Sequence, residues 1–280
     1  MRISIIVPVY NRIENLKYLI YCLKRQTSQI DELIIADDGS SVDVVNFLKK
    51  EVNDLNSTVK YIWQKDLGFR KTRALNNAVK EARGEILIFL DQDVILPFNF
   101  IEIIKKNMKK EYFLPFKIYW MNENERKNFN KEKFEYSDLI LRKEEIKKLK
   151  KQILMSKIKN IKYYLGLKDR GSNIVGAAFS LFKDDYIKVN GFDEEYRGWG
   201  KEDDDISWRL YKAGLKSRHI SLKYPIIHLW HYSDPSKKSG DMNESLFSIK
   251  KEKLNKNNYR CKYGYDNSYD KDEIKILKIK

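Results

Sequence analysis

The first hundred residues alternate short apolar runs with amphipathic stretches, and this alternation restricts the fold more than any other feature of the chain. The apolar runs are rich in β-branched residues and bounded by turn formers, as buried parallel strands are. Between them, apolar residues recur at helical spacing, as in Leu16, Leu19 and Leu23. The pattern predicts an α/β fold with a mostly parallel central sheet flanked by helices. The predicted strands cover residues 3–7, 32–36, 59–63 and 85–90.

Residues 101–170 break this alternation and predict a basic helical insert. Within it, a lysine-rich stretch near 143–165 carries apolar residues at roughly helical spacing, which indicates an amphipathic helix. Further apolar runs at 174–182 and 226–230 predict two more buried strands. The apolar residues of the insert helix are Ile146, Leu149, Ile153, Ile161 and Leu165.

These patterns predict one domain followed by a tail. The domain would span residues 1–235, and the tail from Ser236 is rich in Lys, Asn, Tyr and Ser, with little apolar periodicity. We therefore expect a single domain with a basic C-terminal extension. Its parts are the first half at 1–100, the insert at 101–170, the second half at 171–235 and the tail at 236–280.

The chain is strongly basic, with 55 Lys and Arg against 40 Asp and Glu among 280 residues, a net charge of +15. A nucleic-acid partner is the first hypothesis for such a chain. However, the insert holds 20 basic and 10 acidic residues, and the tail holds 12 basic and 7 acidic residues. The two remaining parts of the chain together have a net charge of zero. Because the excess is local and no nucleic-acid-binding module is recognisable, we expect no nucleic-acid partner. The insert helix could instead rest on an anionic membrane, or could simply be a solvated helix face.

Cysteine content and hydropathy indicate the compartment. Cys22 and Cys261 are too few for a disulfide framework and too far apart in sequence for a zinc knuckle. No apolar run approaches the roughly 20 residues needed to span a bilayer. The N-terminal segment lacks the small-residue cleavage site of a signal peptide. We expect a cytoplasmic protein, with a peripheral position at the inner face of the plasma membrane as the further expectation.

In a parallel α/β sheet the ligand lies beyond the carboxyl ends of the strands, and aspartates follow two of the predicted strands. Asp91 and Asp93 flank Gln92, and alternate residues of an extended chain point the same way, so both carboxylates can face one cation. Aspartates at a strand end also commonly cap turns, and Asp37 and Asp38 have the same alternative. Two such pairs at one edge favour a functional site.

A second acidic group begins a predicted helix directly after a Gly-Trp-Gly sequence. Ordinary N-terminal capping explains one or two acidic residues there. Four adjacent like charges would raise the pKa of at least one, which could prepare a general base. The neighbouring Trp199 offers an aromatic face to the C–H patches of a sugar ring. The four residues are Glu202, Asp203, Asp204 and Asp205.

Two of the three histidines, His228 and His231, lie three residues apart near the last predicted strand. A strand histidine is most often structural. With the aspartates, one imidazole would complete a site for manganese or a similar ion. Residues three apart on a regular strand point to opposite faces, so both could reach one ion only if the chain turns between them. We favour His231 and leave His228 open.

Taken together, these motifs resemble those of the family 2 inverting glycosyltransferases of the GT-A fold. SIIVPVYNR, LIIADDGS, GFRKTRALNNA and IFLDQD match the nucleotide-sugar-binding half. GFDEEYRGWGKEDDDISWRL resembles the acceptor-side motif of β-1,4-galactosyltransferases and chondroitin polymerases, and HLWHYSDPSKK resembles the metal-binding histidine segment that follows it. The resemblance covers residues 1–100 and 171–235.

The resemblance implies roles for individual residues. Asp203 would be the catalytic base, and the metal, Mn²⁺ or Mg²⁺, would bind Asp93 and His231. The sugar and acceptor would contact Trp199, Gly200, Glu202 and Asp204. The residues that would contact the nucleotide-sugar are Pro8, Tyr10, Arg12, Asp38, Arg73, Asp91 and Gln92. Relatives often have Arg-Asn where this chain has Leu75 and Asn76, so the arginine contact would have to come from Arg73 or Arg70.

The implied function is metal-dependent, inverting transfer of a hexose or N-acetylhexosamine of the Gal/GalNAc type. The donor would be a UDP-sugar, and the acceptor a glycan or lipid-linked glycan in bacterial surface polysaccharide synthesis. The alternative is a catalytically silent sugar- or nucleotide-binding module. A Rossmann dehydrogenase is excluded because no G-x-G-x-x-G follows the first predicted strand.

Overall fold

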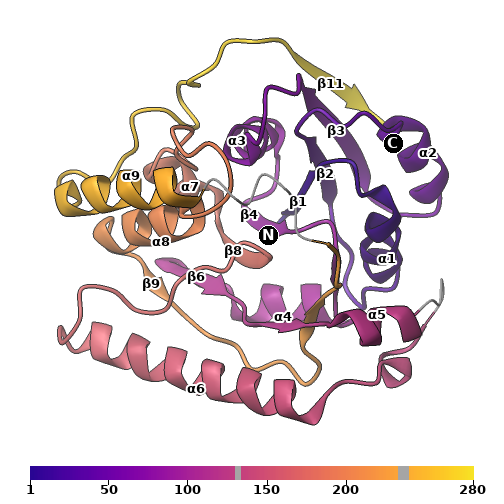
Figure 1. Cartoon of the computed structure of the whole chain (residues 1–280), viewed down its shortest axis with the longest axis horizontal. Helices are drawn as coiled ribbons and strands as arrows, with labels where there is room; N and C mark the ends of the chain where they lie inside the picture. Colours follow the sequence, from indigo (N-terminus) through magenta and orange to yellow (C-terminus); the bar gives the residue numbers. More distant parts are fainter. Residues whose placement is uncertain (130–133, 233–239) are drawn as a thin grey trace.

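The computed structural model describes residues 1–129, 134–232 and 240–280. In this part of the chain, helices flank a large central sheet (Figure 1). The strands are β1 (Ile3–Val9), β2 (Glu32–Asp37), β3 (Thr58–Gln64), β4 (Ile86–Leu90), β5 (Val94–Ile95), β6 (Tyr112–Pro115), β7 (Ile118–Trp120), β8 (Ala178–Phe182), β9 (Lys216–Ser217), β10 (Ile226–His228) and β11 (Ile274–Lys278). The helices are α1 (Ile13–Lys24), α2 (Val44–Glu51), α3 (Lys71–Glu81), α4 (Phe100–Asn107), α5 (Glu123–Asn128), α6 (Lys143–Tyr164), α7 (Lys183–Lys188), α8 (Glu202–Lys212) and α9 (Gly240–Lys253), with a 3-10 turn η1 (Tyr136–Asp138).

The central sheet has the strand order β11-β3-β2-β1-β4-β8-β6-β9. Its core is the parallel set β3, β2, β1 and β4, with β8 added antiparallel to β4. A smaller sheet has the order β5-β10-β7. The four strands predicted in the first hundred residues are confirmed, and the fold is the predicted α/β arrangement with a mainly parallel centre.

Side chains from both faces of this sheet are buried, which explains why its strands are continuous apolar runs. Along β1, Ile5 and Val7 pack in the cluster that includes α1, α2 and α4. Ile6, between them, packs in the cluster that includes α3 and α8. The alternating faces of one strand thus reach two separate apolar layers, and the helices cover both faces of the sheet.

The C-terminal tail differs from the prediction because it completes the sheet. β11 pairs antiparallel with β3, with Ile276 opposite Ile62, and α9 lies beside α8. Without β11, β3 would be an edge strand with unpaired backbone groups, and the short sequence IKILK satisfies them. Residues 240–280 are therefore an integral part of the domain.

The insert contains the predicted basic helix, α6, but its apolar residues do not all face inward. Leu149 is buried and Ile146 and Ile153 are partly buried, whereas Ile161 and Leu165 are 54% and 67% exposed. Ile161 follows Leu149 by twelve residues, which at 100° per residue turns it about 120° away. The expectation of one continuous apolar face was wrong for the C-terminal half of α6.

Among the described residues, no helix combines the length and the apolar character needed to cross a membrane.

Candidate active site

The carboxyl ends of β1, β2 and β4 lie side by side, so the segments after them meet at one edge of the sheet. A cavity of about 270 Å³ opens there. Six of the seven residues predicted to contact the nucleotide-sugar line it, as do both histidines and the predicted metal ligand. The lining residues are Pro8, Val9, Tyr10, Arg12, Asp38, Gly68, Phe69, Lys71, Asp91, Gln92, Asp93, Trp199, His228 and His231.

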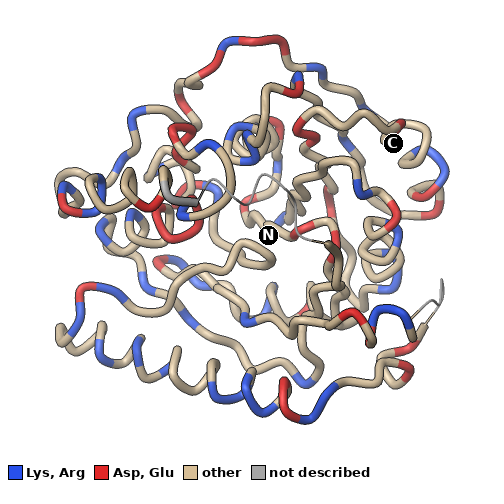
Figure 2. The backbone as a smooth tube through the Cα atoms, viewed as in Figure 1, with Lys and Arg blue, Asp and Glu red and all other residues tan. Residues whose placement is uncertain are grey.

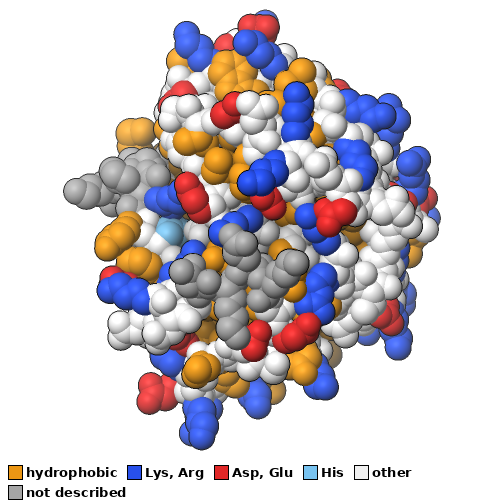
Figure 3. Space-filling model, turned by 90° about the vertical axis from the view of Figure 1, so that its right-hand side faces the viewer, with side chains coloured by type: hydrophobic (Ala, Val, Ile, Leu, Met, Phe, Trp, Pro, Cys, Tyr) orange, Lys and Arg blue, Asp and Glu red, His pale blue; other side chains and the backbone are white. Residues whose placement is uncertain are grey.

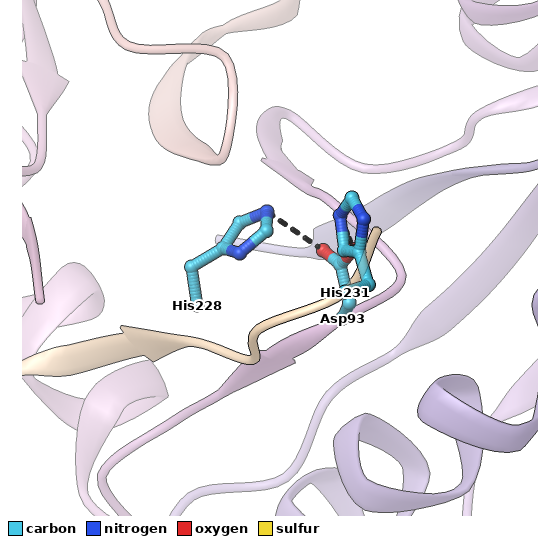
Figure 4. Close-up of side chains that lie close together, drawn as sticks. All are labelled: Asp93, His228 and His231. Carbon is cyan, nitrogen blue, oxygen red and sulfur yellow. Dashed lines mark ion pairs between the residues drawn. The ribbon is translucent and has the colours of Figure 1, made fainter. Parts of the chain in front are cut away.

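Asp93 and both histidines converge at one side of the cavity (Figure 4). Asp93 Oδ1 lies 3.3 Å from His228 Nε2, and Asp93 Oδ2 lies 3.0 Å from His231 Nε2. One ligand atom from each residue lies within 4.8 Å of the others. The structure therefore brings Asp93 and His231 together as predicted, and adds His228.

The end of β10 explains how two histidines three residues apart reach the same carboxylate. His228 is the last residue of β10, paired with Val94 of β5, and the chain leaves the strand after it. His231 can then approach Asp93 from a different side (Figure 4). Its Nδ1 lies 2.7 Å from Arg12 Nη1 and 2.8 Å from the Tyr232 carbonyl oxygen. Because one ring nitrogen cannot both accept from the guanidinium and donate to the carbonyl, one of these contacts is the hydrogen bond in a given tautomer, and either leaves Nε2 toward Asp93.

The residues of this cluster suit a divalent cation. Asp93 Oδ1 is buried and accepts no hydrogen bond within the described structure. Burial would raise the pKa of Asp93, but the imidazoles of His228 and His231 lower it below its usual value, so the carboxylate is anionic. The hydrogen bond to Asp93 raises the pKa of His231. One carboxylate and two imidazoles could together hold a divalent metal ion.

The residues predicted to hold the nucleotide come from the segments after β1, β2 and β4. Tyr10 donates a hydrogen bond of 3.0 Å to Asp66. Asp38 accepts hydrogen bonds of 2.6 Å from Gln64 Nε2 and from the Arg70 backbone N–H, and burial raises its pKa to about 7. Gln92 Oε1 is buried without a described partner, which leaves an acceptor at the cavity wall.

Asp37 stabilises a turn, as the alternative interpretation of this residue predicted. Its Oδ1 accepts hydrogen bonds from the backbone N–H of Ser40 at 2.8 Å and the hydroxyl of Ser40 at 2.7 Å, and its Oδ2 accepts one from Tyr61 at 2.6 Å. The carboxylate thus fixes the turn that places Asp38 at the cavity.

Arg73 does not line the cavity, contrary to prediction. It is buried, and its guanidinium contacts Gln64 at 3.0 Å and the Asp272 carboxylate at 3.3 Å. Arg70 likewise pairs with Asp270 and Asp272, at 2.9 and 2.8 Å. The tail supplies both aspartates, so these arginines attach the C-terminal segment to α3 and are not placed for a phosphate.

The acidic group after Gly-Trp-Gly forms the first turn of α8. Trp199 lines the cavity and is 46% exposed, while Gly200 has a φ of 107°, which only glycine adopts without strain. Glu202 is buried, and its Oε2 has no described partner. Trp199 thus presents an aromatic surface beside a turn that leads directly to the carboxylates.

Asp203 is fitted closely against the backbone of another segment. A Cβ added at Gly176, just before β8, would lie 2.3 Å from Asp203 Oδ2, so only glycine leaves room for this carboxylate. Asp203 Oδ1 is buried and has no described hydrogen-bond partner. Oδ1 is therefore a buried acceptor without a described partner, although Asp203 is not among the residues that line the cavity.

The electrostatic surroundings of Asp203 differ from those of the next two residues in this turn. Burial and the neighbouring Glu202 raise the pKa of Asp203 well above its usual value, while Lys71 lowers it. Asp204 is paired instead, with Arg170 at 3.5 Å and Lys201 at 3.9 Å. Asp205 forms a buried ion pair with Arg209 at 2.6 Å. Asp204 and Asp205 thus have structural partners. None of the four acidic residues of this turn is among those that line the cavity, and neither is Gly200, so of the predicted sugar and acceptor contacts Trp199 alone lines it.

Lys71 connects the two acidic groups and was missed by the sequence analysis. Its Nζ lies 2.9 Å from Asp91 Oδ1. Burial alone would lower the pKa of Lys71, but the carboxylates of Asp91, Asp203 and Glu202 raise it above its ordinary value. A single lysine at the start of a helix has no distinguishing sequence pattern, and Gly176 lies in an apolar run where glycine is unremarkable.

Comparisons with known families match most of this chain. The model described as Glycosyl transferase family 2 matches residues 4–183, and the one described as N-terminal domain of galactosyltransferase matches residues 156–232. The chain is 24% identical to chondroitin synthase of Escherichia coli over 240 residues, which cover 78% of this chain and 33% of the relative. It spans between about a quarter and a half of the length of the first relatives it matches.

Solved structures with the GT-A fold resemble the described structure. The crystal structure of S. aureus TarS 1-349 in complex with UDP-GlcNAc has a TM-score of 0.56 and 17% identity, covering 85% of this chain and 61% of that one. GalNAc-T7 with UDP, GalNAc and Mn²⁺ has a TM-score of 0.57 and 14% identity, covering 90% and 50%. At these identities the likeness shows the fold, and the predicted GT-A fold is confirmed.

Proposed function

This chain belongs to glycosyl transferase family 2, and from that premise we propose that it transfers a hexose or N-acetylhexosamine from a UDP-sugar to a glycan acceptor, with inversion and with a divalent metal. A Gal/GalNAc-type sugar and a role in bacterial surface polysaccharide synthesis are the finer parts of this proposal. The match to the galactosyltransferase model and the similarity to chondroitin synthase support them.

One observation carries the proposal: a single cavity is lined by residues predicted to contact a nucleotide, a metal ion and a sugar. Asp38 and Arg12 form the first of these surfaces, Asp93 with the two histidines forms the second, and Trp199 begins the third. Asp203 follows four residues after Trp199, and Lys71 interacts with both Asp91 and Asp203. A nucleotide-sugar needs all three surfaces in that order.

Asp93, His228 and His231 would hold a divalent ion, which when bound would neutralise the negative charge that develops on the leaving diphosphate. The remaining roles belong to side chains. Asp203 Oδ1 would accept the proton of the attacking acceptor hydroxyl, and Lys71 would favour its ionised form. Trp199 would pack on a sugar ring, and Glu202 Oε2 would accept a sugar hydroxyl.

The inverting part of the proposal requires a carboxylate base on the acceptor side. A single displacement needs a carboxylate that removes the proton from the acceptor, and no covalent intermediate on the protein. Of the four acidic residues of the α8 turn, Asp204 and Asp205 are occupied by ion pairs. Glu202 and Asp203 each combine a buried, unpartnered oxygen with a raised pKa, and we assign the base to Asp203, the position that the family resemblance implies.

The proposal is tested by a screen of UDP-galactose, UDP-GalNAc, UDP-GlcNAc and UDP-glucose, measured calorimetrically with and without Mn²⁺. We expect at least one donor to bind more tightly with Mn²⁺, and to release UDP when glycan or lipid-linked glycan acceptors are added. If the affinity of all four donors is the same with and without Mn²⁺, the metal-dependent site is contradicted.

The second candidate is a sugar- or nucleotide-binding module without activity. It predicts that the donor binds, that no acceptor causes release of UDP, and that no glycosylated product forms. Detection of a β-linked product by NMR from an α-linked donor would exclude it and would establish inversion.

A further inference from the structure

The basic charge of the insert is concentrated on α6 and the turn after it. Residues 146–168 contain eight lysines and no aspartate or glutamate. Figure 2 shows this helix at the lower edge of the molecule, with basic residues along its length and acidic ones at its ends. Lys147, Lys150, Lys151 and Lys162 are exposed and form no ion pair within the described structure. Their charge is uncompensated by the protein.

Exposed apolar side chains lie on the same face as these lysines. Leu154, Ile161 and Leu165 are 58%, 54% and 67% exposed, and their spacings of seven and four residues place them within about 40° of one another around the helix. Lys147 and Lys150 fall on the same stripe, about 20° and 40° from Leu154 by the same geometry, and Lys151 and Lys162 lie along its edge, about 60° and 80° from Leu154. We call the face formed by Lys147, Lys150, Lys151, Leu154, Ile161, Lys162 and Leu165 the outer face of α6.

The opposite face fixes α6 to the domain. Leu149 and Asn160 are buried, and Asn160 donates a 2.9 Å hydrogen bond to the Ser217 carbonyl and accepts one of 2.8 Å from the Ser172 N–H. No described element lies outside α6 (Figure 1). Seen from the side nearest the N-terminal end of α6, basic side chains lie along the lower edge, with hydrophobic and acidic ones among them (Figure 3). The outer face is therefore held in place and open to a partner.

We propose that the outer face of α6 docks on the surface of an anionic lipid bilayer, such as the cytoplasmic leaflet of a membrane. The lysines match the negative lipid headgroups, and the three apolar side chains enter the boundary between headgroups and acyl chains. A soluble polyanion would explain the lysines alone. The exposed leucines and isoleucine favour a lipid surface.

The position of α6 gives this docking a consequence for catalysis. α6 packs against β7, β7 pairs with β10, and β10 ends at His228 of the metal cluster. The active site is thus held near the bilayer, where a lipid-linked acceptor would lie. The inference goes beyond the transfer reaction, because it concerns the place where the reaction occurs.

The test is a cosedimentation assay of the full chain with two kinds of vesicle, phosphatidylcholine alone and phosphatidylcholine mixed with phosphatidylglycerol. We expect binding to the mixed vesicles, little to the neutral ones, and weakening by salt. Equal binding to both, or to neither, would overturn the proposal. Binding to soluble polyphosphate but not to vesicles would also overturn it, in favour of a polyanion.

Two variants locate the contact on α6. Replacing Lys147, Lys150, Lys151 and Lys162 by Gln should lower the partition coefficient at least about a hundredfold, because each basic residue contributes about fivefold near an anionic surface. The matched control replaces the exposed Lys49, Lys50, Lys106 and Lys109 by Gln and should change partitioning less than about threefold on the same scale. Equal losses in both variants would overturn the assignment to α6.

The apolar part is tested by replacing Leu154, Ile161 and Leu165 by Ser. Vesicle binding should fall about tenfold or more, while binding to polyphosphate is unchanged. Unchanged vesicle binding would overturn insertion of the outer face. In both variants, unaltered circular dichroism and unaltered UDP affinity show that the fold and the active site are intact, so a failure here is distinguishable from a failure of the proposed transfer reaction.

Discussion

Two aspartates of the active site, Asp93 and Asp203, are surrounded in opposite ways. Asp93 faces two imidazoles at 3.3 and 3.0 Å, which lower its pKa despite burial. Asp203 lies beside Glu202 in the first turn of α8, where burial and like charge raise its pKa. The same side chain is thus kept anionic at one position and brought toward neutrality at the other.

This difference assigns the two residues to different chemistry. A carboxylate that stays ionised among imidazoles suits a cation, whereas a carboxylate with a raised pKa suits proton transfer near neutral pH. Lys71 links the two regions because it contacts Asp91 and lowers the pKa of Asp203. The predictions below separate the metal region from the base region.

The largest effect is expected for Asp203→Asn. Turnover should fall at least about a hundredfold, in the range for loss of a general base, because the amide cannot accept the acceptor's proton. UDP affinity should be nearly unchanged, since Asp203 does not line the nucleotide side of the cavity. Steady-state kinetics and calorimetry measure both, and near-normal turnover would exclude Asp203 as the base.

The next largest effect is expected for Asp93→Ala. UDP affinity in the presence of Mn²⁺ should fall at least about tenfold, because loss of a direct ligand costs no less than loss of a supporting hydrogen bond to a ligand. Affinity without metal should hardly change. The matched control is Asp54→Ala, an exposed aspartate that pairs with Lys24 far from the cavity. A metal effect that survives in Asp93→Ala would contradict the ligand role.

A smaller effect, visible mainly in the pH profile, is expected for Lys71→Met. The base works when ionised, so the rate rises with pH through the pKa of Asp203. Removing a cation that lowers this pKa should move the acidic limb of kcat to higher pH, by about one unit. Lys71→Arg should restore the original limb. A profile unchanged in Lys71→Met would show that Lys71 acts only through Asp91.

The smallest effect on ligand binding is expected for Arg73→Ala. UDP affinity should stay within about twofold, because the guanidinium faces Asp272 and Gln64. The free energy of unfolding should fall by about 1–3 kcal/mol, because the buried Gln64 Oε1 loses a hydrogen-bond donor, while Asp272 keeps its ion pair with Arg70. Denaturant titration measures the second quantity. A large loss of UDP affinity in a stably folded variant would return Arg73 to the nucleotide site.

That the aspartates after the strands share one cavity could be predicted from the sequence, because a parallel sheet places all its carboxyl ends at one edge. Asp38, Asp91 and Asp93 follow apolar runs, so their shared position needed no knowledge of tertiary contacts. The carboxylates of the α8 turn were found in the same way, through the crowding of like charges.

What the sequence could not predict depends on contacts between distant segments. Gly176 matters because Asp203 packs against it, and Arg73 is diverted by Asp272, about 200 residues away. β11 is five residues long, and lysines interrupt its apolar residues, so the sequence pattern is too short to predict a strand. Its pairing with β3 in the structure identifies it. His228 stayed open because its role depends on where β10 ends.

The most direct measurement of the central claim is calorimetric titration of UDP, with and without Mn²⁺, into Asp93→Asn and Asp203→Asn side by side. The account predicts that the dependence of UDP affinity on Mn²⁺ is lost in Asp93→Asn and retained in Asp203→Asn. Loss of that dependence in both variants, or its survival in both, would contradict the division of roles between the two aspartates.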